Sequence, residues 1–268
     1  MRRPAGPFER LTIDDLTIRD ERSLRHVALY AQLKEVVRRA RHPFRALSPA
    51  GRTAREDRAL FLNLTYWAPD AGGDVLAARS IDADVVAHVA WHHLATRALP
   101  ASQGRPSAAA LFLGEAIASA FDMYLVGRLL GHAPKSMFLE TQVPAMAETA
   151  RAAGVSKTEF TRMLGGIAAD PDRAFAEMRE LLWDAAMALH ASRTSEEACG
   201  VLAAFDRHRF GRLLHRYELS NWVLYARAYA RPGRGDRRPR DVDAALRAAK
   251  APLDWLADRW VAPALAPR

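Results

Sequence analysis

The chain has one cysteine, Cys199, among its 268 residues. A single cysteine excludes an internal disulfide framework and any metal site built from several thiolates. We expect Cys199 to be a small core residue. Long apolar runs are also missing, because no stretch of about 18 uninterrupted apolar residues occurs, and we therefore expect no membrane span.

The N-terminal sequence MRRPAGPFERL lacks the apolar segment that follows the basic residues of a secretory signal peptide. With almost no cysteine available for disulfides, the default expectation is a cytoplasmic protein of bacterial type.

Lysine is scarce. Only Lys34, Lys135, Lys157 and Lys250 occur among 39 basic residues, and the net charge is +8. A basic chain suggests nucleic-acid binding. However, an arginine- and alanine-rich composition is typical of a GC-rich genome, and the basic clusters at 38–41 and 231–240 lack interleaved aromatic residues. We therefore expect a solvated basic surface, and a basic nucleic-acid-binding helical protein is the weakest alternative.

Helical periodicity extends over most of the chain and predicts an all-α fold, a single-domain multi-helix bundle over 1–268. No run of strands is visible. Residues 1–20 and 231–240 are expected to be flexible or loop, and 42–78 to be irregular or to hold a short hairpin. The helices are expected at 22–41, from Ser80 to Pro100, and at 107–131, 137–153, 156–167, 171–192, 195–229 with a break, and 241–261.

The stretch AHVAWHH places His88 and His92 four residues apart, on one face of the expected helix and about 6 Å apart along its axis. Ser80 is expected to be the N-cap of this helix, with Asp82 and Asp84 in its first turn. Taken alone, such a histidine pair is weak evidence for a metal site.

The next helix, 107–131, is apolar or small on all sides, which indicates a helix enclosed by others. Glu115, Asp122 and Arg128 are its exceptions. Burying a lone carboxylate costs on the order of several kcal/mol unless it is paired or binds a metal. If the two helices pack antiparallel, Glu115 falls beside His88 and His92.

Two imidazoles and one carboxylate with an open position form the ligand set of a catalytic zinc site. We therefore predict that His88, His92 and Glu115 bind Zn²⁺ or another divalent metal. Asp122 or Asp84 would accept the other ring N–H of a histidine. The alternative is a metal-free polar network in which the histidines are hydrogen-bonded to Asp84 and Glu115.

HVAWH followed by GEAIASAFD resembles the gluzincin class of zinc metallopeptidases, which are thermolysin-like in plan. The resemblance covers roughly residues 84–125. It implies a zincin-like helix pair at the centre of the fold, with His88, His92 and Glu115 as the zinc ligands. Two positions depart from the family pattern. Val89 occupies the place of the catalytic glutamate, and Ser119 occupies the place of an acid four residues after the third ligand.

Valine cannot act as a general base, so this metal site is not predicted to hydrolyse peptides by the standard mechanism. The prediction is a metal-dependent enzyme acting on a small-molecule or peptide substrate, with His93 and Asp122 as candidate catalytic residues. One alternative is a non-catalytic pseudo-metallopeptidase that serves as a binding or regulatory module. The oligomeric state is open.

A second carboxylate group is weaker. Glu177, Glu180 and Asp184 are three and four residues apart, as in the acidic face of a dinuclear iron or manganese bundle. The Glu-x-x-His signature of such bundles is missing, and surface acids paired with arginines explain the pattern equally well.

Overall fold

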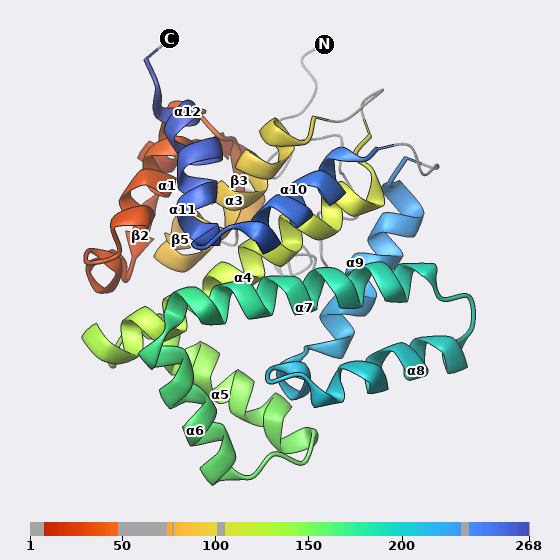
Figure 1. The fold of residues 1–268 in the computed structure, drawn as a ribbon. Helices are drawn as coiled ribbons and strands as arrows, with labels where there is room; N and C mark the ends of the chain where they lie inside the picture. Colours follow the sequence, from red (N-terminus) through yellow and green to blue (C-terminus); the bar gives the residue numbers. More distant parts are fainter. Residues whose placement is uncertain (1–7, 48–73, 77, 101–104, 232–235, 268) are drawn as a thin grey trace. The chain divides into compact units, whose positions relative to one another are not determined.

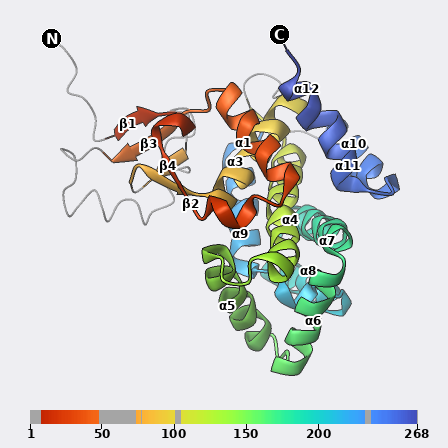
Figure 2. The same ribbon diagram turned by 90° about the vertical axis from the view of Figure 1, so that its left-hand side faces the viewer.

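The computed structural model describes residues 8–47, 74–76, 78–100, 105–231 and 236–267, and helices dominate them (Figures 1 and 2). The predicted all-α fold class is confirmed. Contacts group the chain into two compact units, Met1–Ala90 and Trp91–Arg268, and the division falls inside helix α3 (Ala83–Ala98). The boundary of a single domain over 1–268 stays a prediction.

The first unit contains short strands. Strand β1 (Phe8–Leu11) pairs antiparallel with β3 (Phe44–Leu47), which pairs in parallel with β4 (Asp74–Leu76). Strand β2 (Thr17–Arg19) pairs in parallel with β5 (Ser80–Asp82). The expectation that residues 1–20 are flexible or loop is therefore wrong for 8–11 and 17–19, and residues 1–7 lie outside the described part of the chain. Strands of three or four residues offer too few positions for a visible alternation of polar and apolar residues.

The segment 42–78 holds β3 and β4, which are parallel and so do not form a hairpin with each other. Residues 48–73 and 77 of this segment lie outside the described part of the chain. The amphipathic helix expected at 22–41 is present as the 3-10 helix Glu21–Leu24 followed by α1 (Ala28–Arg39). Its buried residues are Tyr30, Leu33, Val36 and Val37.

Helix α3 begins three residues later than expected. Ser80 pairs with Thr17 in a strand instead of capping the helix, so its predicted N-cap role is wrong. The backbone of Ser80 is extended by strand pairing, and the helix starts only at Ala83. Asp84 lies in the first turn, as predicted, whereas the prediction for Asp82 is wrong because Asp82 is the last residue of β5.

Helix α4 (Ala108–His132) lies at the centre of the second unit. It packs most extensively against α7 (Pro171–Ala191), which runs alongside it in Figures 1 and 2. Further contacts come from α5 (Met137–Ala152), α6 (Lys157–Ala169), α9 (Arg216–Tyr229) and α10 (Arg238–Ala248). The prediction that other helices enclose this segment is confirmed.

By length and composition α4 could also cross a membrane, and it is the one such helix among the described residues. Its most apolar window is 67% buried inside the structure, as in the core helix of a helical body. This feature is therefore weak evidence for a membrane span.

Polar caps explain why the helices of the second unit begin where they do. The side chains of Ser107, Ser136, Ser156, Asp170 and Thr194 each accept a hydrogen bond from the backbone N–H three residues ahead. These bonds satisfy N–H groups that have no partner within the helix, so each helix has a defined first residue.

The break expected within 195–229 is confirmed. Helix α8 (Ser195–Ala204) and α9 are separated by two 3-10 turns, Phe205–Arg207 and Gly211–Leu213. The last helices are α11 (Pro252–Leu256), a π-helical turn at Ala257–Val261, and α12 (Ala262–Leu265). The expected loop at 231–240 ends earlier than predicted, because proline is tolerated in the first turn of a helix and α10 starts at Arg238.

Candidate metal centre

Helix α3 carries two of the three predicted ligands, one turn apart on the same continuous helix. The residues Val86, Ala87, Ala90 and Trp91 are buried around them. Within the second unit, the Trp91 ring meets the Phe121 ring of α4 edge to face, with centroids 5.6 Å apart. The Thr96 hydroxyl donates to the His92 carbonyl oxygen at 2.9 Å. Packing on its apolar face therefore fixes the rotation of α3.

Gly114 allows α3 and α4 to approach closely beside the third ligand. A Cβ at this position would lie 3.3 Å from Ala95 Cβ and 3.8 Å from His92 Nδ1. The first distance is tighter than most Cβ contacts, so a side chain here would require the neighbouring atoms to move by a small amount, and glycine avoids this. Glu115, the next residue, consequently lies within reach of His92. This role of Gly114 was not predicted from the sequence, although a glycine directly before an acid in an apolar stretch is a signal for it.

The structure brings His88, His92 and Glu115 together as predicted. One ligand atom from each residue lies within 4.8 Å of the other two, and this group could hold a metal ion. His92 Nε2 and Glu115 Oε2 are 3.4 Å apart. Two ligands of a tetrahedral zinc ion, bound at 2.0–2.2 Å, lie about 3.3 Å from each other. The donor set and the spacing of this pair therefore fit a divalent metal.

The same distance bears on the metal-free alternative. The nitrogen and oxygen atoms of a direct N–H···O hydrogen bond are about 2.7–3.2 Å apart, and the separation of His92 Nε2 and Glu115 Oε2 is longer. A separation of 3.4 Å is also within ion-pair distance, so it fits the metal-free network as well as two ligands of one ion.

The cluster is partly open to solvent. The His92 side chain is 37% exposed and the Glu115 side chain 31% exposed. Glu115 is thus less buried than the sequence indicated, so the desolvation cost that a partner would have to offset is smaller. The openness has a second consequence, because a catalytic metal needs a coordination position that water or substrate can reach.

Val89 is 7% exposed and belongs to the packed interior of the first unit. The residue that follows His88 therefore offers neither a proton acceptor nor an accessible side chain. Its burial agrees with an apolar residue at this position.

The two predicted catalytic residues stay predictions. His93 is half-buried on α3, and Asp122 is half-buried on α4, seven residues after Glu115. Neither belongs to the three-residue cluster, which is the one group of possible metal ligands among the described residues.

The acids on α7 are paired with arginines. Glu177 receives Arg173 at 2.7 Å and Arg209 at 3.0 Å. Arg247 of α10 contacts Asp184 at 2.6 Å and Glu180 at 3.5 Å. This arrangement supports the interpretation of these acids as members of surface ion pairs rather than as ligands of a dinuclear metal site.

The expectation for Cys199 is wrong, because this cysteine is exposed. It lies on α8, a helix with no buried residue. A short apolar run on a helix that covers the outside of the unit was mistaken for core.

Comparison with known proteins adds no relative to this geometry: no family model, no curated protein and no solved structure matches the chain. The likeness to gluzincins consequently rests on the residues of α3 and α4 alone.

Proposed function

We propose that the chain is a metal-dependent enzyme whose ion, zinc in the first instance, is bound by His88, His92 and Glu115. The observation that carries the proposal is the convergence of these three ligand atoms within 4.8 Å on two helices. Two further observations support it: the 3.4 Å separation of His92 and Glu115, and the partial exposure of both side chains.

A bound zinc ion would act as a Lewis acid toward a substrate carbonyl or a water molecule. The chain itself would supply two imidazoles and a carboxylate that hold the site. Val89 leaves the usual general base missing, so a proton would have to be accepted by another group. His93 and Asp122 are the candidates from the chain, and the substrate is the remaining one.

Standard peptide hydrolysis is therefore not the proposed activity. The proposed substrates are a small molecule or a peptide that reacts without the gluzincin base. The burial of Val89 specifically favours one alternative, in which the same metal site serves a non-catalytic binding or regulatory module. The two differ in turnover and agree in metal binding.

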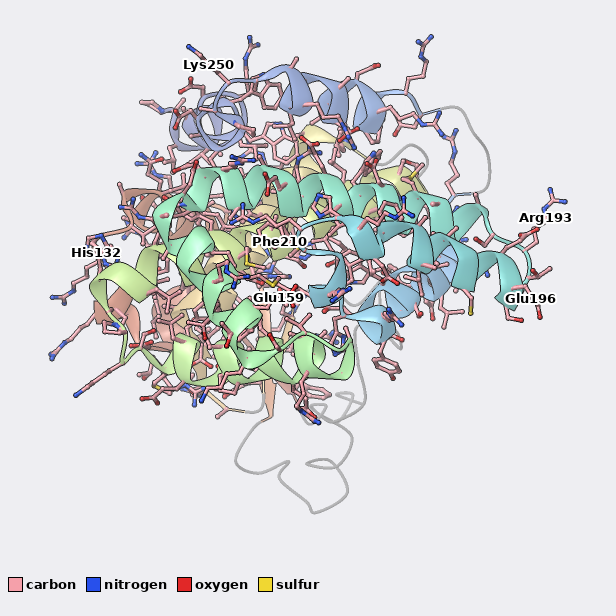
Figure 3. The ribbon with its side chains drawn as sticks, turned by 60° about the horizontal axis from the view of Figure 1, so that its bottom comes forward. His132, Glu159, Arg193, Glu196, Phe210 and Lys250 are labelled. Carbon is pink, nitrogen blue, oxygen red and sulfur yellow. The ribbon has the colours of Figure 1, made fainter. Side chains whose placement is uncertain are left out.

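The test is metal titration of the purified, chelator-treated protein with Zn²⁺, followed by analysis of bound metal after desalting. We expect one ion per chain, and at least a tenfold loss of affinity in His88→Gln, His92→Gln and Glu115→Gln. His132→Gln is the matched control, because His132 is an exposed residue at the far end of α4 (Figure 3). Circular dichroism of each variant confirms that the helices are retained.

Two results would count against the proposal. A wild-type protein without stoichiometric metal would remove the metal site itself. Equal affinity in the three ligand variants and in His132→Gln would place the ion elsewhere.

A further inference from the structure

A second candidate site lies in the second unit, where a cavity of 470 Å³ opens between α5 and the segment that leads into α9. None of the three metal ligands lines it. Its volume falls within the range of about 300–1,000 Å³ that is usual for small-molecule sites. The α5 wall is made of alanines with Glu148 and Thr149, and the opposite wall carries Arg212, His215 and Arg216 around Leu214.

The two walls carry opposite charges that are not neutralised by one another. Among the described residues, neither Glu148 on α5 nor Arg212 on the facing segment takes part in an ion pair. Both side chains are exposed to the cavity and the solvent. Their neighbours are already engaged: Arg216 contacts Asp206 at 3.5 Å, and His215 Nδ1 accepts the backbone N–H of Glu218. One carboxylate and one guanidinium therefore remain available to a ligand.

The arginine-bearing wall is preformed. Phe210 is fully buried, and Figure 3 shows it in the interior of the unit. Leu213 and Leu214 are also buried, at 9% and 5% exposure. Gly211 is required at the turn, because a Cβ there would lie only 1.8 Å from the Phe205 carbonyl oxygen. These anchors fix the backbone that carries Arg212, so a ligand has to order the arginine side chain but not the wall itself.

We propose that this cavity binds a small zwitterion, a molecule that carries both a free ammonium group and a carboxylate, such as an amino acid or a dipeptide. The ammonium group pairs with Glu148. The carboxylate pairs with Arg212, whose planar guanidinium can donate two parallel hydrogen bonds to it. The alanine side chains of α5 leave room for a small apolar group between the two charges. Because His215 already caps α9, side chains rather than the helix end hold the ligand.

The test is calorimetric titration of metal-free, chelator-treated protein, so that coordination of an amino acid to a metal does not contribute. The probes are alanine, the dipeptide Ala-Ala, its N-acetylated form, which keeps only the carboxylate, and its C-terminal amide, which keeps only the ammonium. We expect binding of alanine or Ala-Ala in about the millimolar range. Each blocked form should bind at least tenfold more weakly than Ala-Ala.

The variants Glu148→Gln and Arg212→Gln identify the two walls. We expect Glu148→Gln to abolish the preference for a free ammonium group, and Arg212→Gln to abolish the preference for a free carboxylate. Glu140→Gln on α5 and Arg162→Gln on α6, both exposed and outside the cavity, should leave every affinity unchanged. Tighter binding of the N-acetylated dipeptide than of Ala-Ala would instead show a simple anion site. That result, or no binding of any probe, overturns the proposal.

Discussion

His92 Nε2 lies 3.4 Å from Glu115 Oε2. The residue directly before that glutamate is Gly114, where a Cβ would lie 3.8 Å from His92 Nδ1 and 3.3 Å from Ala95 Cβ. The close approach of these two candidate ligands is therefore favoured by a glycine that is not itself one of them. Gly114 is a positioning residue, because it sets the separation of α3 and α4 where they carry His92 and Glu115.

The first prediction concerns Gly114→Val. The added methyl groups would enter the space of Ala95 Cβ and His92 Nδ1, and the helices would have to separate. We expect Zn²⁺ affinity to fall at least tenfold in metal titration while the helical circular dichroism signal is kept.

Gly131→Val is the matched control, since Gly131 lies on the same helix and a Cβ there meets nothing within 4 Å. Its affinity for Zn²⁺ should equal that of the wild type. If both variants lose the metal equally, the loss reflects general damage to α4 rather than the approach at Gly114.

The second prediction concerns a buried ion pair between α7 and α10. Arg179 is fully buried and donates to Asp243, whose side chain is 12% exposed and also receives Arg247 at 2.9 Å. Asp243→Ala would leave the buried Arg179 cation with Glu180, at 3.4 Å, as its remaining ion-pair partner among the described residues. Removing one partner of a buried pair costs about 3–5 kcal/mol. Urea unfolding should show this loss.

An exposed pair on the same helix provides the comparison. Arg173 is 67% exposed and pairs with Glu177 at 2.7 Å, and exposed pairs contribute about 0.2–1 kcal/mol. Arg173→Ala should therefore shift the unfolding midpoint far less than Asp243→Ala. Similar shifts for the two variants would contradict the assignment of Arg179–Asp243 as the dominant pair.

The helices were predictable because their signals are local. The 3.6-residue periodicity, the serine and aspartate caps and the Gly/Pro breaks all lie within a few residues of the ends that they define. The grouping of His88, His92 and Glu115 was predictable for a related reason, since His88 and His92 share a helix face and Glu115 is one of two acids in an otherwise apolar stretch.

Features that depend on distant residues were not predictable. Strand β2 forms only because β5, some sixty residues later, pairs with it. The cavity at Glu148 and Arg212 needs the positions of α5 and of the turn at Gly211, which no spacing in the sequence encodes. The exposure of a side chain also depends on which distant elements cover it. For this reason Cys199 and Glu115 were both expected to be more buried than they are.

The third prediction concerns acid stability. Hydrogen bonds from Arg38 and Arg39 lower the pKa of Glu35 on α1 to about 2, below its ordinary value of 4.5. A carboxylate with a lowered pKa favours the folded state when it is ionised. Its contribution is complete above about pH 4.5 and is lost as the pH falls toward 2.

Glu35→Gln should therefore unfold at a lower temperature than the wild type at pH 7, and the difference should shrink between pH 4.5 and pH 2. The measurement is thermal unfolding across this pH range. Glu140→Gln serves as the control, because Glu140 makes no ion pair within the described residues. A Glu35→Gln deficit that is constant with pH would argue against the Arg38 and Arg39 interactions as its cause.

The last prediction concerns Val89→Glu, which places a glutamate where the gluzincin motif has one. In that family the glutamate accepts a proton from water, so a retired peptidase would regain activity through this change. Here the side chain at position 89 is 7% exposed. Transferring a carboxylate into such a buried position costs on the order of several kcal/mol unless the carboxylate is protonated or paired. We expect reduced stability at neutral pH and no peptidase activity in a fluorogenic peptide assay.

The control is Val89→Gln, whose side chain has nearly the same shape as that of Val89→Glu without the charge. This variant should be less destabilised than Val89→Glu. Peptide hydrolysis by Val89→Glu with Zn²⁺ bound, and none by Val89→Gln, would contradict this expectation and show that position 89 can reach the metal-bound water.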